Sequence, residues 1–114
     1  MIYFLAHSDW ILFNSRKEVA SNLKKHNYKV NAITTDEKYK NDLKKYFNEF
    51  YEWKVDRNKL VDIRGIINLR KILKILTSKD TLHVYTLKSG LYVLFASHFM
   101  KKEYKLIISI TGLG

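Results

Sequence analysis

The first 33 residues of the chain alternate between strand and helix patterns. Residues 2–6 form a short apolar run, residues 7–10 form a turn with ionisable groups, and residues 15–26 follow a helical pattern. Residues 28–33 then return to a strand pattern. This order is a βαβ unit, in which the two strands lie parallel in one sheet. The loop that leaves the first strand of such a unit is a common place for a ligand.

The same alternation continues along the chain and predicts the fold class. Further helices are expected at residues 35–46, 62–77 and from residue 89, and further strands at residues 50–55, 82–85 and 105–110. Alternating strands and helices favour a parallel sheet with helices on both faces. Right-handed crossovers favour the strand order 3-2-1-4-5. We therefore expect an α/β, Rossmann-like, doubly wound fold that covers residues 1–114 as a single domain.

Local patterns near the N-terminus predict where the first helix begins and ends. Ser15 and Glu18 have the spacing of a capping box, in which the serine hydroxyl accepts one free N–H and the glutamate reaches back to another. The helix is therefore expected to begin at Ser15. Asn27 is expected to end it in a left-handed conformation. Thr35 and Asp36 are expected to cap the second helix.

The two later helices differ in how their apolar residues are spaced. The helix of residues 62–77 gathers apolar side chains on one side and basic ones on the other. Ile63, Ile67 and Ile75 fall on the basic side, where they either dip into an interface or pack on a neighbouring element. The helix that opens at Ser89 and Gly90 is apolar nearly all round, which predicts that it is well buried.

Composition excludes several classes of protein. The sequence has no cysteine, which excludes disulfides and thiolate chemistry and is consistent with a cytoplasmic protein. Its longest apolar stretch, residues 91–100, is too short to cross a bilayer, which needs about 20 residues. The formal charge of +10 favours phosphates, other polyanions or an anionic membrane surface. A solvated, lysine-rich surface is the alternative explanation for this charge.

The expected topology brings five loops to the carboxyl ends of the strands, where open parallel sheets bind ligands. They comprise residues 7–14, 34–36, 56–59, 86–90 and 111–114. His7 and Asp9 are candidates for acid–base chemistry, because histidine titrates near neutrality and a nearby carboxylate can orient it. The alternative is a hydrogen-bonded loop histidine and a turn-forming aspartate. Trp10 is either a sugar or lipid platform or a packing residue.

Lys88 stands just before the expected start of a helix, where free N–H groups, the helix dipole and an ammonium group could hold a phosphate. A solvated lysine is the alternative. His83, within a strand, and His26 and His98, on helices, are interpreted as structural. No Walker loop, glycine fingerprint, HExxH spacing or nucleophile elbow is present, and no nucleic-acid-binding motif supports the charge.

The order of the sequence patterns is similar to that of a known family. His7-Ser8-Asp9-Trp10 follows the first strand, and residues 12–18 and 23–30 continue into the helix and the next strand. These residues resemble the N-terminal domain of GT-B glycosyltransferases of the large retaining family four, which builds bacterial capsule, O-antigen and exopolysaccharide. Residues 83–88, which read His-x-x-Thr-x-Lys, and residues 110–114 resemble later segments of that domain. Asn27 stands where the family usually has glycine.

The resemblance implies the acceptor-side half of a transferase. His7 and Asp9 are then expected to act in catalysis, and no residue is expected to bind a metal. The expected acceptor-binding residues are Ser8, Trp10, Asn14, Arg16, Thr86, Lys88 and Ser89. Thr111, Gly112 and Gly114 are expected at the cleft or hinge that faces a second domain.

The resemblance also implies partners for the domain. A C-terminal donor-binding domain, in cis or on a separate chain, would hold the nucleotide-sugar donor, and catalysis would be independent of metal. The acceptor would be a lipid-linked glycan at the inner face of the cytoplasmic membrane. The domain alone is expected to be inactive. Two alternatives are a non-enzymatic, flavodoxin-like binding module that acts with a partner chain, and nucleic-acid binding, which rests on charge only.

Overall fold

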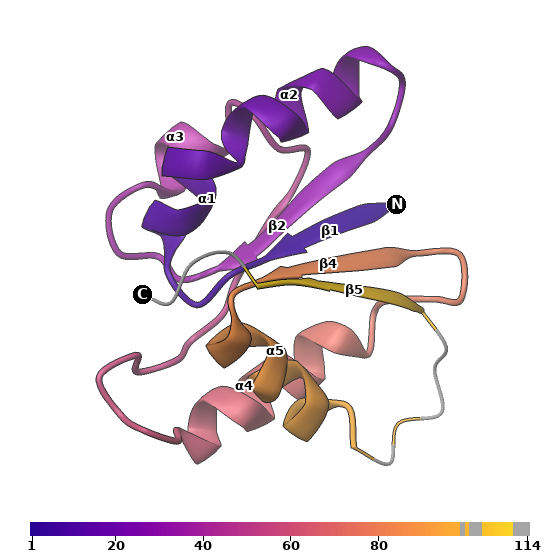
Figure 1. Cartoon of the computed structure of the whole chain (residues 1–114). Coiled ribbons are helices and arrows are strands. Elements are labelled where there is room, and N and C mark those ends of the chain that lie inside the picture. Colours follow the sequence, from indigo (N-terminus) through magenta and orange to yellow (C-terminus); the bar gives the residue numbers. More distant parts are fainter. Residues whose placement is uncertain (99, 101–103, 111–114) are drawn as a thin grey trace.

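The computed structural model describes residues 1–98, 100 and 104–110, and they form an α/β fold (Figure 1). The five strands are β1 (Ile2–Leu5), β2 (Val30–Thr34), β3 (Phe50–Glu52), β4 (Thr81–Tyr85) and β5 (Lys105–Ser109). The helices are α1 (Asp9–Ser15), α2 (Lys17–Lys25), α3 (Lys40–Leu43), α4 (Ile63–Leu73) and α5 (Leu87–Ala96). All neighbouring strands pair in parallel, in the order β3-β2-β1-β4-β5. The predicted fold class and strand order are confirmed.

The sheet separates two helical layers. Helices α1, α2 and α3 cover one face, and α4 and α5 cover the other (Figure 1). Strand β1 shows why both faces are covered: Tyr3 and Leu5 point into one buried cluster, and Phe4 and Ala6 point into the other. Because successive side chains of a strand point to opposite faces, a run without polar residues needs a helix on each side.

The first helix begins earlier than the sequence predicts. Helix α1 starts at Asp9, directly after the first loop, and the chain breaks at Arg16 before α2. The predicted capping box at Ser15 is wrong, because the Ser15 hydroxyl lies inside the helical segment and donates to the Ile11 carbonyl at 2.7 Å. The predicted stop is confirmed: Asn27 has φ 67°, and the Tyr28 N–H closes the helix on the Leu23 carbonyl.

The second predicted helix, residues 35–46, is mostly loop. Only Lys40–Leu43 is an α-helix, and the predicted cap at Thr35 is wrong. The Thr35 hydroxyl accepts instead from the Asp9 N–H, at 3.0 Å. Strand β3 is also shorter than residues 50–55, although the Trp53 N–H still donates to the Thr34 carbonyl. Long-range contacts with the first loop therefore override the local helical pattern.

Helices α4 and α5 pack side by side, with α5 against β4 and β5 (Figure 1). Helix α4 has the predicted faces: Leu69 and Leu73 are fully buried, and Ile63 and Ile67 are exposed. The prediction for α5 is wrong in one respect, because one side of this apolar helix stands in solvent. The exposed residues are Leu87, Leu91, Leu94 and Phe95. No helix in the described part of the chain is long and apolar enough to cross a membrane.

Candidate functional site

His7 is held at the centre of the sheet edge by the residues that open α5. Its ring Nδ1 lies 3.1 Å from Thr86 Oγ1 and 3.0 Å from Ser89 Oγ. Its backbone N–H donates to the same Ser89 hydroxyl, at 3.0 Å. His7 follows β1 and Thr86 follows β4, and these two strands are neighbours at the point where the strand order reverses. The structure thus brings together three predicted site residues from distant parts of the chain.

The backbone of Thr86 is strained at this position. Its φ of 85° and ψ of 150° are values that residues other than glycine rarely adopt. The surrounding contacts hold this conformation: the Thr86 N–H donates to the Ser109 carbonyl, and its hydroxyl accepts from the Ser89 N–H as the N-cap of α5. Strained residues that persist in this way cluster at functional sites.

His7 is neutral at physiological pH. Burial, with Lys88 and Arg57 adding positive charge nearby, lowers the pKa of His7 to about 4. The Ser89 hydroxyl oxygen accepts hydrogen bonds from the backbone N–H of His7 and from the Thr86 hydroxyl. We therefore assign the proton of the Ser89 hydroxyl to its bond with Nδ1 of the His7 ring. The proton of the imidazole is then assigned to Nε2. In this arrangement the Nε2–H group of His7 can donate a hydrogen bond to a ligand. The other ring nitrogen, Nδ1, already accepts from Ser89 and is not free to act as a base.

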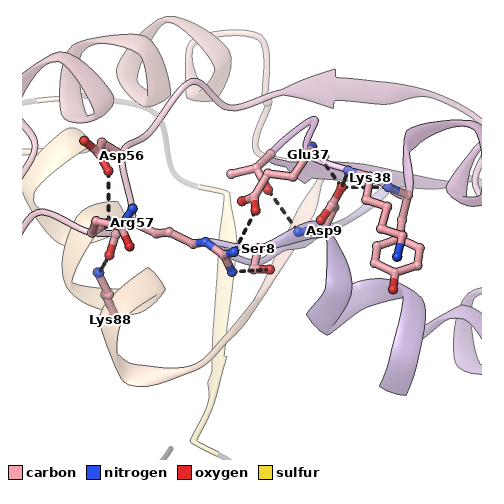
Figure 2. A network of polar contacts seen from close by, with 10 residues as sticks. Ser8, Asp9, Glu37, Lys38, Asp56, Arg57 and Lys88 are labelled. Atoms are coloured by element: carbon pink, nitrogen blue, oxygen red, sulfur yellow. Dashed lines mark hydrogen bonds and ion pairs between the residues drawn. The ribbon is translucent and has the colours of Figure 1, made fainter.

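Asp9 is engaged with the loop that follows β2. Its side-chain Oδ2 accepts from the backbone N–H groups of residues 37, 38 and 39, at 3.0, 2.7 and 2.8 Å. Only 1 % of Asp9 is exposed. Figure 2 shows the carboxylate directed at these amides. The arrangement fixes the loop beside the site, and a direct catalytic role for Asp9 stays a prediction of the sequence.

Two cations, one from the loop after β3 and one from the first turn of α5, complete the site (Figure 2). Arg57, in the loop after β3, donates to Ser8 Oγ at 3.2 Å and pairs with the Glu37 carboxylate at 2.9 Å. Lys88 donates from Nζ to the Arg57 carbonyl at 2.6 Å. No sequence pattern assigns Arg57 or Glu37 an individual role, although the predicted topology brings residues 56–59 to this edge of the sheet. No local pattern distinguishes them from other surface charges.

A pocket of about 260 Å³ opens beside these residues. Its walls are residues 8–10 from the first loop, residues 37–39 from the second, and Arg57. Trp10, one of these lining residues, is half exposed, with 51 % of its surface accessible. The pocket therefore combines a half-exposed tryptophan with hydroxyl, carboxylate and guanidinium groups.

The remaining predicted residues that the structure describes do not line this pocket. Asn14 is exposed near the end of α1. The Arg16 guanidinium lies 4.4 Å from the centre of the Tyr85 ring, and among the described residues its buried Nε has no hydrogen-bond partner. His83 bonds to Tyr85 and Ser109, which fits its structural interpretation. Thr111, Gly112 and Gly114 lie outside the described residues.

Within residues 1–98, 100 and 104–110, no three acidic or histidine side chains gather as metal ligands. The fold and the cluster at the strand ends define a Rossmann-like ligand-binding domain, with its site at the switch point between β1 and β4.

Comparison with known protein families identifies the family to which this Rossmann-like domain belongs. The profile of the glycosyl transferase 4-like family matches residues 1–114, and the chain belongs to that family. It is therefore a domain of the N-terminal GT-B half of such glycosyltransferases. No curated protein is similar enough to the chain to count as a match.

Proposed function

We propose that this domain binds the acceptor of a sugar transfer, and that the acceptor is a glycan joined to a lipid through a diphosphate. The pocket beside Trp10 carries the proposal. A sugar ring has an apolar face that stacks on an exposed indole, while its hydroxyls bond to carboxylate and guanidinium groups. Glu37 and Arg57 supply these groups in the same pocket.

The phosphates of the acceptor lie next to this pocket in our proposal. Arg57 and Lys88 both lie close enough to His7 to add positive charge there, and the Lys88 ammonium bonds to the Arg57 backbone carbonyl. Charge-assisted bonds to phosphate are stronger than neutral ones. The assigned Nε2 proton of His7 adds a neutral donor that orients an oxygen without changing the charge.

The reaction that we propose uses a nucleotide-sugar donor held by a separate donor-binding domain, in cis or on another chain. Transfer retains the anomeric configuration and needs no metal. His7 positions the acceptor, and Asp9 acts on it indirectly, by fixing residues 37–39 at the pocket wall. The product belongs to cell-surface polysaccharide such as capsule or lipopolysaccharide, and the domain works in the cytoplasm, at the inner face of the membrane.

A binding experiment separates an acceptor site from a donor site. Isotope-labelled protein is titrated with a panel of monosaccharides on a short prenyl diphosphate, and in parallel with the nucleotide diphosphates of the same sugars. At least one prenyl-linked sugar should shift the amide signals of residues 7–10 and 37–39 in a saturable way. The nucleotide sugars should leave these signals unchanged at the same concentrations.

A pair of variants tests the role of the indole. Trp10→Ala should weaken binding of the prenyl-linked sugar by about fivefold, since an aromatic contact contributes roughly 1 kcal/mol. Tyr28→Ala is the matched control, because Tyr28 is equally exposed but precedes β2 at the opposite edge of the sheet. Saturable binding of a nucleotide sugar at residues 7–10, or no response to any glycan, would contradict the proposal and favour a non-enzymatic binding module.

A further inference from the structure

We infer that the groove between α5 and the loop after β3 holds the first part of the acceptor's hydrocarbon chain. The inference rests on the proposed function, because it assigns a place to the lipid part of the same acceptor. It starts from the exposed side of α5, which the all-round apolar sequence of that helix does not predict.

The groove is a fixed feature with a bond at each end. At one end Lys88 Nζ donates to the Arg57 carbonyl at 2.6 Å (Figure 2). At the other end the Asp62 N–H donates to the Tyr92 hydroxyl at 2.8 Å. The loop is therefore fastened to α5 on both sides of Leu60 and Val61. These two side chains stand out between the bonds, with 94 % and 54 % of their surfaces exposed.

The opposite wall of the groove comes from one stripe of α5. Leu91 and Phe95 are four residues apart, on the same side of the helix, and 47 % and 58 % of their surfaces are exposed. With Lys88 and Tyr92 they enclose about 60 Å³, several times the space that one water molecule needs. Exposed apolar side chains that gather in this way mark a binding surface.

Charge decides the kind of occupant. The groove has an ammonium group, Lys88, at one end, and that group bonds to the backbone of Arg57, which lines the sugar pocket. From Lys88 to Phe95 the helix rises about 10 Å with apolar side chains along it. An amphiphile with an anionic head fits this order, with its phosphates at the cations and its chain along α5. The sugar pocket, the cations and the groove then lie in the same order as the sugar, the diphosphate and the hydrocarbon chain of a glycan–diphosphate–lipid.

The test uses probes that carry no sugar, so its result is independent of the glycan pocket. Binding of farnesyl diphosphate and isopentenyl diphosphate to the whole chain is measured by calorimetry. The two share the diphosphate and differ in chain length. Farnesyl diphosphate should bind at least about tenfold more tightly, because its longer chain reaches the groove.

Two leucine variants locate the chain. Leu91→Gln should remove most of the gain from the longer chain and leave isopentenyl diphosphate binding unchanged. Leu94→Gln is the matched control: Leu94 is on the same helix and 53 % exposed, but it does not line the groove. Both residues are about half exposed, so unfolding curves should show that both variants fold.

Four results would overturn the inference while leaving the sugar pocket standing. Three of them are equal affinity for the two diphosphates, an equal loss in both leucine variants, and no loss in Leu91→Gln. The fourth is a flotation result, in which binding to phosphatidylglycerol vesicles depends on Leu91 while diphosphate affinity does not depend on chain length. The surface would then be a general membrane contact. A chain-length gain without any response to prenyl-linked sugars would instead support the groove and contradict the glycan acceptor.

Discussion

The two sides of the strand-end site are built on different principles. On the side of β2, the buried carboxylate of Asp9 collects three backbone N–H groups, and the Thr35 hydroxyl accepts from the Asp9 N–H. On the side of α5, Lys88 and Arg57 keep their charges near solvent, and leucines stand uncovered. On the first side, the polar groups already have hydrogen-bond partners within the chain. On the second side, the cations and the exposed leucines can still contact a ligand.

Within this one site, the β2 side therefore mainly stabilises the loops, and the α5 side is the part that can bind a ligand. A buried carboxylate with several hydrogen bonds stabilises a loop, and its loss leaves donors unpaired. An exposed ion pair adds little to stability, because water already solvates both charges. Stability and ligand binding should therefore respond to different substitutions, and four predictions test that separation.

Asp9→Ala should have the largest effect on stability. The substitution leaves three backbone N–H groups without their charged acceptor, and the free energy of unfolding should fall by about 3 kcal/mol. Urea unfolding at pH 7 measures the change. Asp42→Ala is the control, since Asp42 forms a solvent-exposed pair with Lys45 at 3.9 Å and should cost under about 0.5 kcal/mol. A loss below about 1 kcal/mol at Asp9 would show that the loop is held by other contacts.

The second prediction concerns acid sensitivity at His7. Its pKa is about 4 in the folded protein and near 6.5 in an unfolded chain. As the pH falls below about 6.5, only the unfolded state gains the proton, so folding loses stability until about pH 4. At pH 5 the loss attributable to His7 should be about 2 kcal/mol.

His7→Asn isolates this effect, because it removes the titrating group at a similar hydrogen-bonding position. The stability difference between pH 7 and pH 5 should be smaller in the variant than in the original chain. His83, whose pKa is also lowered by burial, is present in both proteins and cancels in the comparison. Equal pH dependence of the two proteins would mean that His7 accepts a proton in the folded state as readily as in the unfolded chain.

A third, smaller effect is expected at Thr86, between the two sides. Ala and Gly both remove the hydroxyl, but only Gly relieves the positive φ of this residue. Thr86→Gly should therefore be more stable than Thr86→Ala by about 1 kcal/mol. The same pair at Ser8, another N-cap but with an extended φ of −148°, is the control and should show a smaller difference. An equal difference at both positions would remove the argument from strain.

The contrast between the two sides also explains what the sequence could and could not predict. Strand order and the faces of α4 follow from the periodicity of apolar residues, and the strand ends place His7 and Lys88 at one edge. The amides that bond to the Asp9 carboxylate lie 28 to 30 residues away, and the side-chain partners of Arg57 are also remote in sequence, so no local pattern contains them. The Ser15 capping box fails because the chain turns into a helix directly after Ser8. An all-apolar helix such as α5 shows no pattern that identifies its uncovered side.

The fourth prediction concerns Arg57, where we expect the smallest effect on stability and the largest effect on binding. Arg57→Gln removes an ion pair whose side chains are 48 % and 36 % exposed, and the free energy of unfolding should change by less than about 0.5 kcal/mol. Binding of isopentenyl diphosphate should nevertheless weaken by about tenfold, because a charged hydrogen bond to phosphate contributes more than a neutral one. Lys54→Gln, a matched loss of one charge outside the site, should leave that binding unchanged. Equal weakening in both variants would mean that net charge, rather than a built phosphate site, attracts the ligand, and the separation of the two sides would fail.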